Sequence, residues 1–202
     1  MSLAVLSSGV LHGTEMIPVR VEIHVGSGLP NFSIVGMPDV GVRESRERVR
    51  AAIINSGFTF PMARITVNLA PADLPKDSGR FDLAIALGIL LASGQLEQQS
   101  AEGEPPRLET YFFAGELSLT GAVVAVAGSL ALACGVHKQC PQQTLVLPCV
   151  SAQLASHVPN LKVIGVQSLF EAAQFFCGYV DLEPVHKQPL VVQSSPQFCM
   201  SE

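Results

Sequence analysis

A short charged loop holds residues that could bind phosphate or carboxylate groups. It contains Lys76, Asp77, Arg80 and Asp82 and leads into the apolar segment Leu83–Ala92, which is rich in helix-forming residues. A polar loop that feeds a buried helix is one way to build a site, because the loop groups stay reachable while the helix fixes them. Arg80 could pair with an external phosphate or carboxylate, or it could pair with Asp77 or Asp82 and fix the loop.

A second cationic group lies on an expected helix. Met37-Pro38-Asp39 indicates a helix start with Asp39 as N-cap, and the helix should run to about Asn55 before Gly57 ends it. Its apolar residues fall on one face, and another face carries Arg43, Arg46 and Arg50. Three guanidinium groups one turn apart could meet successive phosphates of a nucleic acid. Alternatively, Glu44 and Glu47 pair with Arg43, Arg48 and Arg50 on a solvated or intersubunit face.

The elements that would position these residues follow from hydrophobic periodicity. An alternating pattern predicts three N-terminal strands that form an antiparallel meander, at 3–11, 17–25 and 32–35, and a fourth strand at 64–69. The last third alternates strands at 111–117, 144–147 and 162–166 with helices at 127–137, 150–157 and 169–176. This alternation indicates a parallel or mixed subsheet, in contrast to the meander at the start.

Composition limits the class of protein. The chain has 202 residues, 48% of them hydrophobic, and a net charge of -5, which favours a globular protein over a polybasic nucleic-acid binder. Five cysteines without a CxxC pair, and no signal peptide, favour reduced thiols in the cytoplasm. Gly121, Gly128 and Gly135 indicate that the uncharged stretch 117–136 is strand, turn and helix rather than a membrane span. His12 and His24 lack neighbouring ligands, so we expect no metal site.

Two segments look like connections. The loop at 97–106, rich in Glu and Gln and ending in two prolines, is the expected boundary between two lobes of one domain that spans residues 1–180. The polar, proline-punctuated stretch 181–202 is expected to be a linker. The chain contains no GxxxxGK[ST] loop, so we expect it to lack a phosphate-cradling ATP site of that kind.

Two long strings carry a family resemblance. SIVGMPDVGVRESRERVRAAIINSGFTFP and RITVNLAPADLPKDSGRFDLAIALGILLASGQ resemble the amino-terminal domain of the ComM or YifB family, magnesium-chelatase-like AAA+ proteins, and the likeness covers about residues 3–180. The resemblance implies an α+β fold of the Lon-protease-like, ribosomal-protein-domain-2-like type, in which strands and crossing helices form two layers. It also implies that a AAA+ module with ATP and Mg follows this domain. The intact protein would then be a ring-forming, hexameric ATPase that acts on DNA during uptake and recombination.

The same resemblance allows a comparison with Lon proteases. Their PKDGPSAG loop, laid on PKDSGRFD, places the nucleophile position at Arg80, and GELSLTGAVVAVAGSL places the lysine position at Leu130. A Ser-Lys mechanism needs a hydroxyl close to an amine of lowered pKa, which arginine and leucine cannot supply. We therefore expect a non-catalytic module that supports ring assembly or guides DNA through Arg43, Arg46, Arg50, Lys76 and Arg80. The alternative is a residual peptidase that uses Ser78 or Ser129 as nucleophile and Lys76 or Lys138 as base.

Overall fold

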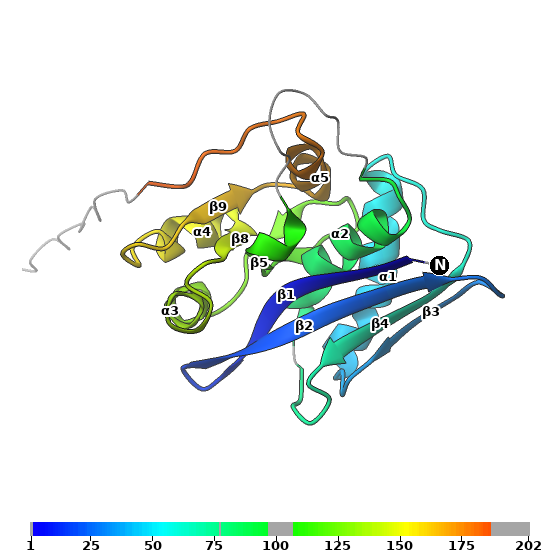
Figure 1. The fold of residues 1–202 in the computed structure, drawn as a ribbon, viewed down its shortest axis with the longest axis horizontal. Coiled ribbons are helices and arrows are strands. Elements are labelled where there is room, and N and C mark those ends of the chain that lie inside the picture. Colours follow the sequence, from blue (N-terminus) through cyan, green and yellow to red (C-terminus); the bar gives the residue numbers. More distant parts are fainter. Residues whose placement is uncertain (1, 77, 97–106, 187–202) are drawn as a thin grey trace, which may run out of the picture.

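A seven-stranded mixed sheet runs through the whole molecule (Figure 1). The computed structural model describes residues 2–76, 78–96 and 107–186. The order in the sheet is β3-β4-β2-β1-β5-β8-β9, with β3 at one end and β9 at the other. The strands are β1 (Ser2–His12), β2 (Glu15–Gly26), β3 (Asn31–Val35), β4 (Arg64–Ala70), β5 (Tyr111–Phe113), β8 (Thr144–Pro148) and β9 (Val163–Val166). A separate two-stranded ribbon consists of β6 (Glu116–Leu117) and β7 (Val123–Val124).

Five α-helices pack against this sheet, which confirms an α+β fold. They are α1 (Val40–Asn55), α2 (Asp82–Ala92), α3 (Ser129–Gln139), α4 (Cys149–Ala155) and α5 (Leu169–Cys177). Two 3₁₀ turns, η1 (Gly79–Phe81) and η2 (Leu108–Thr110), precede α2 and β5. Asp39 is the N-cap of α1 as expected, since its Oδ1 accepts the Val42 N–H at 2.8 Å.

The N-terminal strands do not form the simple meander that the sequence suggested. β1 and β2 form an antiparallel hairpin, but the other edge of β2 pairs with β4. β3 instead pairs with β4 in parallel, because α1 carries the chain from β3 back to the start of β4. The crossover therefore leaves β3 at the end of the sheet.

The sheet separates two hydrophobic cores. Successive strand residues alternate between them: Phe113 and Val146 face the core beneath α1, α2 and α5, whereas Phe112 and Leu145 face the core beneath α3 and α4. Strands β5, β8 and β9 are apolar on both faces, which is typical of parallel strands covered by helices. The expected two layers thus hold near β3 and β4, while three layers stack around β8.

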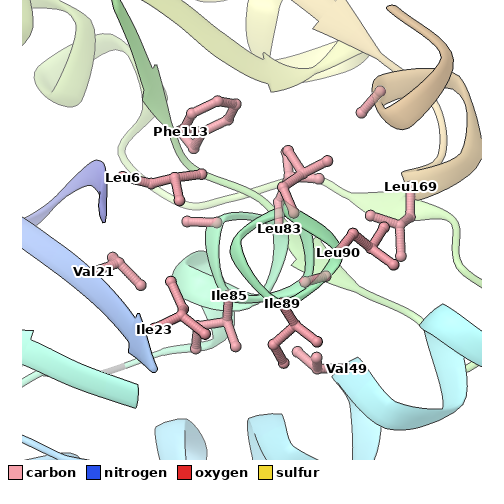
Figure 2. Packing of buried hydrophobic residues seen from close by; sticks show 14 of the residues in the cluster. Leu6, Val21, Ile23, Val49, Leu83, Ile85, Ile89, Leu90, Phe113 and Leu169 are labelled. Atoms are coloured by element: carbon pink, nitrogen blue, oxygen red, sulfur yellow. The ribbon is translucent and has the colours of Figure 1, made fainter. Parts of the chain in front are cut away.

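Helix α2 is the centre of the larger core. Ten of its eleven residues are buried, and Figure 2 shows side chains from β1, β2, α1, β5 and α5 around it. Gly88 permits this approach, because a Cβ there would lie 2.3 Å from Ile23 Cδ1. The charged loop before α2 is therefore anchored to the most buried helix of the fold.

The strand expected at 111–117 is interrupted. Ala114 N–H donates to Val146 O, but the next N–H, of Gly115, turns to Arg80 O at 2.9 Å, and Gly115 O accepts the Leu83 N–H at 3.0 Å. The chain leaves the sheet at this point, and the backbone of Gly115 hydrogen-bonds to the segment at the start of α2 instead. This turn brings β6 next to the charged loop.

The stretch 117–136 forms part of β6, all of β7 and the start of α3, as expected. In the described ranges, no helix has the length and apolar character needed to cross a membrane. The expected lobe boundary at 97–106 lies outside the described residues, as does most of the expected linker. Strands from both sides of 97–106 join one sheet, since β1 pairs with β5 in parallel.

Candidate functional site

A buried ion pair joins α1 to the start of α2. Arg48 Nε donates to Asp82 Oδ2 at 2.7 Å, and Arg48 Nη2 donates to Asp82 Oδ1 at 3.3 Å. The guanidinium group therefore binds the carboxylate through two hydrogen bonds. The Asp82 side chain is fully buried, and that of Arg48 is 19% exposed. This pair forms the polar centre of the candidate site.

Further hydrogen bonds from two elements, α1 and β6, fix the pair. Arg48 Nη2 also donates to Gly41 O and to Ser45 Oγ within α1. The Leu117 N–H of β6 donates to Asp82 Oδ2 at 3.2 Å. Because every one of these partners is itself held by a helix or strand, the site is rigid.

Burial and charge oppose each other at Asp82. Burial raises the pKa of the Asp82 carboxyl, while the hydrogen bonds from Arg48 and Ser45 and the Arg48 charge oppose that rise. The hydrogen bond to Asp82 raises the pKa of the Arg48 guanidinium, so Arg48 stays charged.

The space beside Gly79 is filled by the side chains of Arg48 and Glu116. A Cβ added at Gly79 would lie 2.7 Å from the Glu116 side chain and 2.8 Å from Arg48 Nη2. Gly79 stands one residue before the position where the Lon comparison places the nucleophile. The neighbourhood of that position is therefore crowded by Arg48 and Glu116.

Arg80 lies in this crowded loop and is only 7% exposed. Its Nε donates to Ser78 Oγ at 2.9 Å. Arg48 holds the Asp82 carboxylate, and Asp77 lies outside the described residues, so the expected pairing of Arg80 with Asp77 or Asp82 stays a prediction. Leu130, at the other position taken from Lon, is half exposed in the first turn of α3.

Lys76 is buried rather than displayed in the loop. Its side chain is fully inaccessible and its Nζ donates to Pro71 O. Its backbone bonds to Met37 O and to the Asp39 N–H, which ties the loop to the start of α1. Burial lowers the pKa of the Lys76 amine, and the nearby Asp73 charge opposes this.

The residues of the peptidase alternative make other contacts. Ser78 Oγ accepts a hydrogen bond from Arg80, and Lys76 Nζ points to a carbonyl. Ser129 is buried in the first turn of α3, whereas Lys138 is exposed in its last turn. The two ends of an eleven-residue helix are about 15 Å apart, which is too far for proton transfer between Ser129 and Lys138.

Three of the four arginines of α1 form an exposed row, named here the arginine row: Arg43, Arg46 and Arg50. Arg46 Nε donates to Arg43 O at 3.2 Å and its Nη1 reaches Phe32 O at 3.5 Å. The Arg50 guanidinium lies over the Phe60 ring, 5.4 Å from its centroid. The structure thus keeps the arginine row at the surface, apart from the buried Lys76 and Arg80.

Two hollows open between this row and β3. The first, of about 330 Å³, is lined by Phe32, Phe60, Arg46, Arg50 and Glu47 together with neighbouring residues. The second, of about 310 Å³, is lined by Ser33, Ile34, Arg43 and Arg46. Arg46 contributes to both hollows and separates them.

The acidic residues of α1 only partly neutralise this surface. Glu44 reaches Arg48 at 4.0 Å, so one of the expected pairs forms. Among the described residues, Glu47 makes no ion pair of 4.0 Å or less with Arg43 or Arg50. Within 2–76, 78–96 and 107–186, no three His, Cys, Asp or Glu side chains form a group that could hold a metal ion.

The sequence reasoning missed the Arg48–Asp82 pair. One signal could have revealed it: Asp82 is a carboxylate at the head of an otherwise apolar helix, and a charge that enters a core needs an opposite charge. The partner could not be chosen from sequence, because several arginines on α1 were available.

Comparison with known proteins supports the resemblance. The family described as subunit ChlI of Mg-chelatase matches residues 21–151. The competence protein ComM of Haemophilus influenzae is 40% identical over 178 residues, which cover 88% of this chain and 33% of that protein. The uncharacterized protein YifB of Salmonella typhimurium is 47% identical over 133 residues, 66% of this chain and 25% of that protein.

A more distant relative extends the match. An uncharacterized protein of Mycobacterium tuberculosis (strain H37Rv) is 37% identical over 182 residues, 90% of this chain and 35% of that protein. The chain therefore spans only about a quarter to a third of the length of the curated relatives that it matches.

Proposed function

The chain belongs to the family described as subunit ChlI of Mg-chelatase, and we propose that it is the non-catalytic amino-terminal module of a ComM-like ATPase that acts on DNA. The relatives named ComM and YifB are longer and match this chain over part of their length. We place ATP and Mg binding, ring assembly and ATP hydrolysis in the longer cytoplasmic protein. Residues 1–180 are its Lon-protease-like domain and 181–202 its linker.

The Arg48–Asp82 pair carries the non-catalytic part of the proposal. A peptidase keeps open space beside its nucleophile so that a peptide carbonyl can approach. Here Arg48 and Glu116 crowd Gly79, and Arg80 stands where the comparison with Lon places the nucleophile. The arrangement stabilises a fold and offers little room to a substrate.

The arginine row carries the DNA part. It presents three guanidinium groups on one side of α1 over eight residues, about 10 Å of helix. Arginine forms two hydrogen bonds with a phosphate and stays charged at any physiological pH. Lys76 and Arg80 were grouped with these residues from sequence, but their burial assigns them to the loop itself. We therefore assign DNA guidance to Arg43, Arg46 and Arg50.

Fluorescence anisotropy with a labelled single-stranded oligonucleotide tests this assignment. We expect binding at low salt that weakens as salt rises, and loss of binding when Arg43, Arg46 and Arg50 are all replaced by Gln. The matched control replaces Arg20, Lys138 and Lys162 by Gln, which removes the same charge from other exposed positions. Equal losses in the two variants would show that net charge, and not the arginine row, is responsible.

One observation favours a second candidate, a residual Ser-Lys peptidase. Lys76 is a buried amine with a lowered pKa two residues from Ser78, whose φ of 68° is unusual for a residue other than glycine. Incubation with unfolded casein separates the two functions. We expect no cleavage by the wild-type chain, and cleavage abolished by Ser78→Ala but kept by Arg80→Ala would establish the peptidase.

A further inference from the structure

The outer edge of β3 pairs with no strand among the described residues. In that part of the chain β3 pairs only with β4, and it lies at the end of the sheet (Figure 1). Asn31 N–H donates to Ala63 O, so residue 31 points its backbone groups toward β4. In a parallel ladder the next residue points the opposite way, and the N–H and C=O groups of Phe32 and Ile34 therefore point out of the sheet.

The position of Arg46 agrees with this orientation. Its Nη1 donates to Phe32 O at 3.5 Å, so this carbonyl points away from β4 and toward the arginine row. α1 thus forms one wall of a groove, called here the β3–α1 groove, and the outer edge of β3 forms the other. A groove between an edge strand and a helix can accept an extended peptide as an additional strand.

The two hollows fit the spacing of such a strand. One lies beside Phe32 and the other beside Ile34, two residues further along β3. Side chains on one face of a strand recur every second residue, about 6.6 Å apart. Residues i and i+2 of an added strand would each have a hollow on the side of α1.

The charge of the hollows selects acidic side chains. The first is lined by Arg46 and Arg50 and the second by Arg43 and Arg46, against a single lining carboxylate, that of Glu47. A carboxylate can accept two hydrogen bonds from one guanidinium group. Glutamate side chains that enter the two hollows would therefore be bound by the arginine row.

We propose that the β3–α1 groove binds an extended acidic segment of a partner protein, which pairs with β3 as an eighth strand and competes with DNA. The proposal rests on the DNA-guiding role of the arginine row, because it assigns a regulatory ligand to that same surface. Main-chain hydrogen bonds to the Phe32 N–H and to the N–H and C=O of Ile34 supply affinity, and the carboxylates supply specificity, since they draw Arg46 away from Phe32 O. DNA can contact the arginines but has no peptide backbone that could pair with β3. Only the peptide should therefore form hydrogen bonds with the backbone of Ile34.

The direct test uses the peptide acetyl-Glu-Val-Glu-Val-Glu-Val-amide and the 202-residue chain. Amide hydrogen exchange followed by NMR should show new protection at Phe32 and Ile34 when the peptide is added. A second version of this peptide is methylated at alternate backbone nitrogens, on the edge that would face β3. It keeps its charge but loses the N–H groups that would pair with β3. It should bind at least about tenfold more weakly, the effect of losing one or two hydrogen bonds.

A variant separates the peptide from DNA. Ile34→Pro removes the outward N–H, while the ladder with β4 uses residues 33 and 35, and proline is tolerated on an edge strand at such a position. We expect this variant to lose peptide binding and to retain oligonucleotide binding. Arg46→Gln should weaken both ligands, and Glu47→Gln should tighten both.

The outcomes distinguish this inference from the proposed function. Oligonucleotide binding without any peptide binding overturns the inference and leaves the DNA role intact. Peptide binding without oligonucleotide binding supports the groove as a peptide site and refutes the DNA role. Equal affinity for the methylated and unmethylated peptides overturns strand pairing, and this arm gives an answer even if Ile34→Pro does not fold.

Discussion

Replacement of Arg48 by Met tests the buried pair that fixes the candidate site. Asp82 is fully buried, and without Arg48 its carboxylate would keep the Leu117 N–H but lose its counter-charge. Removal of one partner from a buried pair typically costs 3–5 kcal/mol. Because the Arg48 side chain is 19% exposed, we expect the lower end, a loss of about 3 kcal/mol.

A double-variant cycle isolates the interaction. Asp82→Asn keeps the shape of the side chain and should cost about 1–2 kcal/mol. Arg48→Met combined with Asp82→Asn should cost clearly less than the sum of the two single changes, because no charge is then left buried. Urea unfolding followed by circular dichroism measures each free energy. Arg46→Met, an exposed change on the same helix, is the control and should stay within about 0.5 kcal/mol of wild type.

Acidification provides an independent check. Burial raises the pKa of Asp82, and loss of Arg48 removes the main opposing contribution, so the folded pKa rises further above the ordinary value of 3.8. The folded variant then binds more protons than the unfolded chain, and its free energy of unfolding increases as pH falls through the folded pKa. The difference in free energy of unfolding between wild type and Arg48→Met should therefore become smaller toward acidic pH. A deficit below about 1 kcal/mol at neutral pH, or one that grows on acidification, would refute the reasoning.

Three further predictions use the same unfolding assay. Asp39→Ala removes the N-cap of α1 and should cost about 1 kcal/mol, whereas Asp39→Asn should cost little; equal losses would deny a capping role. Gly88→Ala places a methyl group against Ile23 Cδ1 and should cost about 1–3 kcal/mol; an unchanged midpoint would mean that α2 is not held so closely. Lys76→Met removes a buried amine whose only described hydrogen bond is to Pro71 O, so it should be neutral or stabilising by up to about 1 kcal/mol at pH 7. Because burial lowers the pKa of Lys76 below 10.5, the unfolded wild type binds more protons above the folded pKa, and its free energy of unfolding should rise with pH there. A rise of the same size in Lys76→Met would contradict that assignment.

Local patterns predicted most of the secondary structure. The alternation of apolar and polar residues in 17–25 and 64–69 placed β2 and β4, and the cap at Asp39 placed α1. The pairing of β3 with β4 could not be predicted in this way, because it depends on the path of α1 across the sheet. The break at Gly115 depends on hydrogen bonds to Arg80 and Leu83, which lie more than thirty residues earlier in the chain.

The candidate site was predictable only in part. The arginine row was found because helical spacing alone places Arg43, Arg46 and Arg50 on one face. Lys76 was expected to be accessible, since lysine is almost always exposed. Only the three-dimensional structure shows that its side chain is buried. Asp82 was considered only as one possible partner of Arg80, whereas the structure pairs it with Arg48, 34 positions away on α1.

The salt dependence of single-stranded DNA binding tests the central claim most directly. If the arginine row contacts three phosphates, a plot of the logarithm of the binding constant against the logarithm of salt concentration should have a slope of about -2, from 0.7 per phosphate on a single strand. Replacement of the arginine row by Gln should bring this slope close to zero. No binding at low salt, or the same slope in wild type and variant, would contradict the role of this module in guiding DNA.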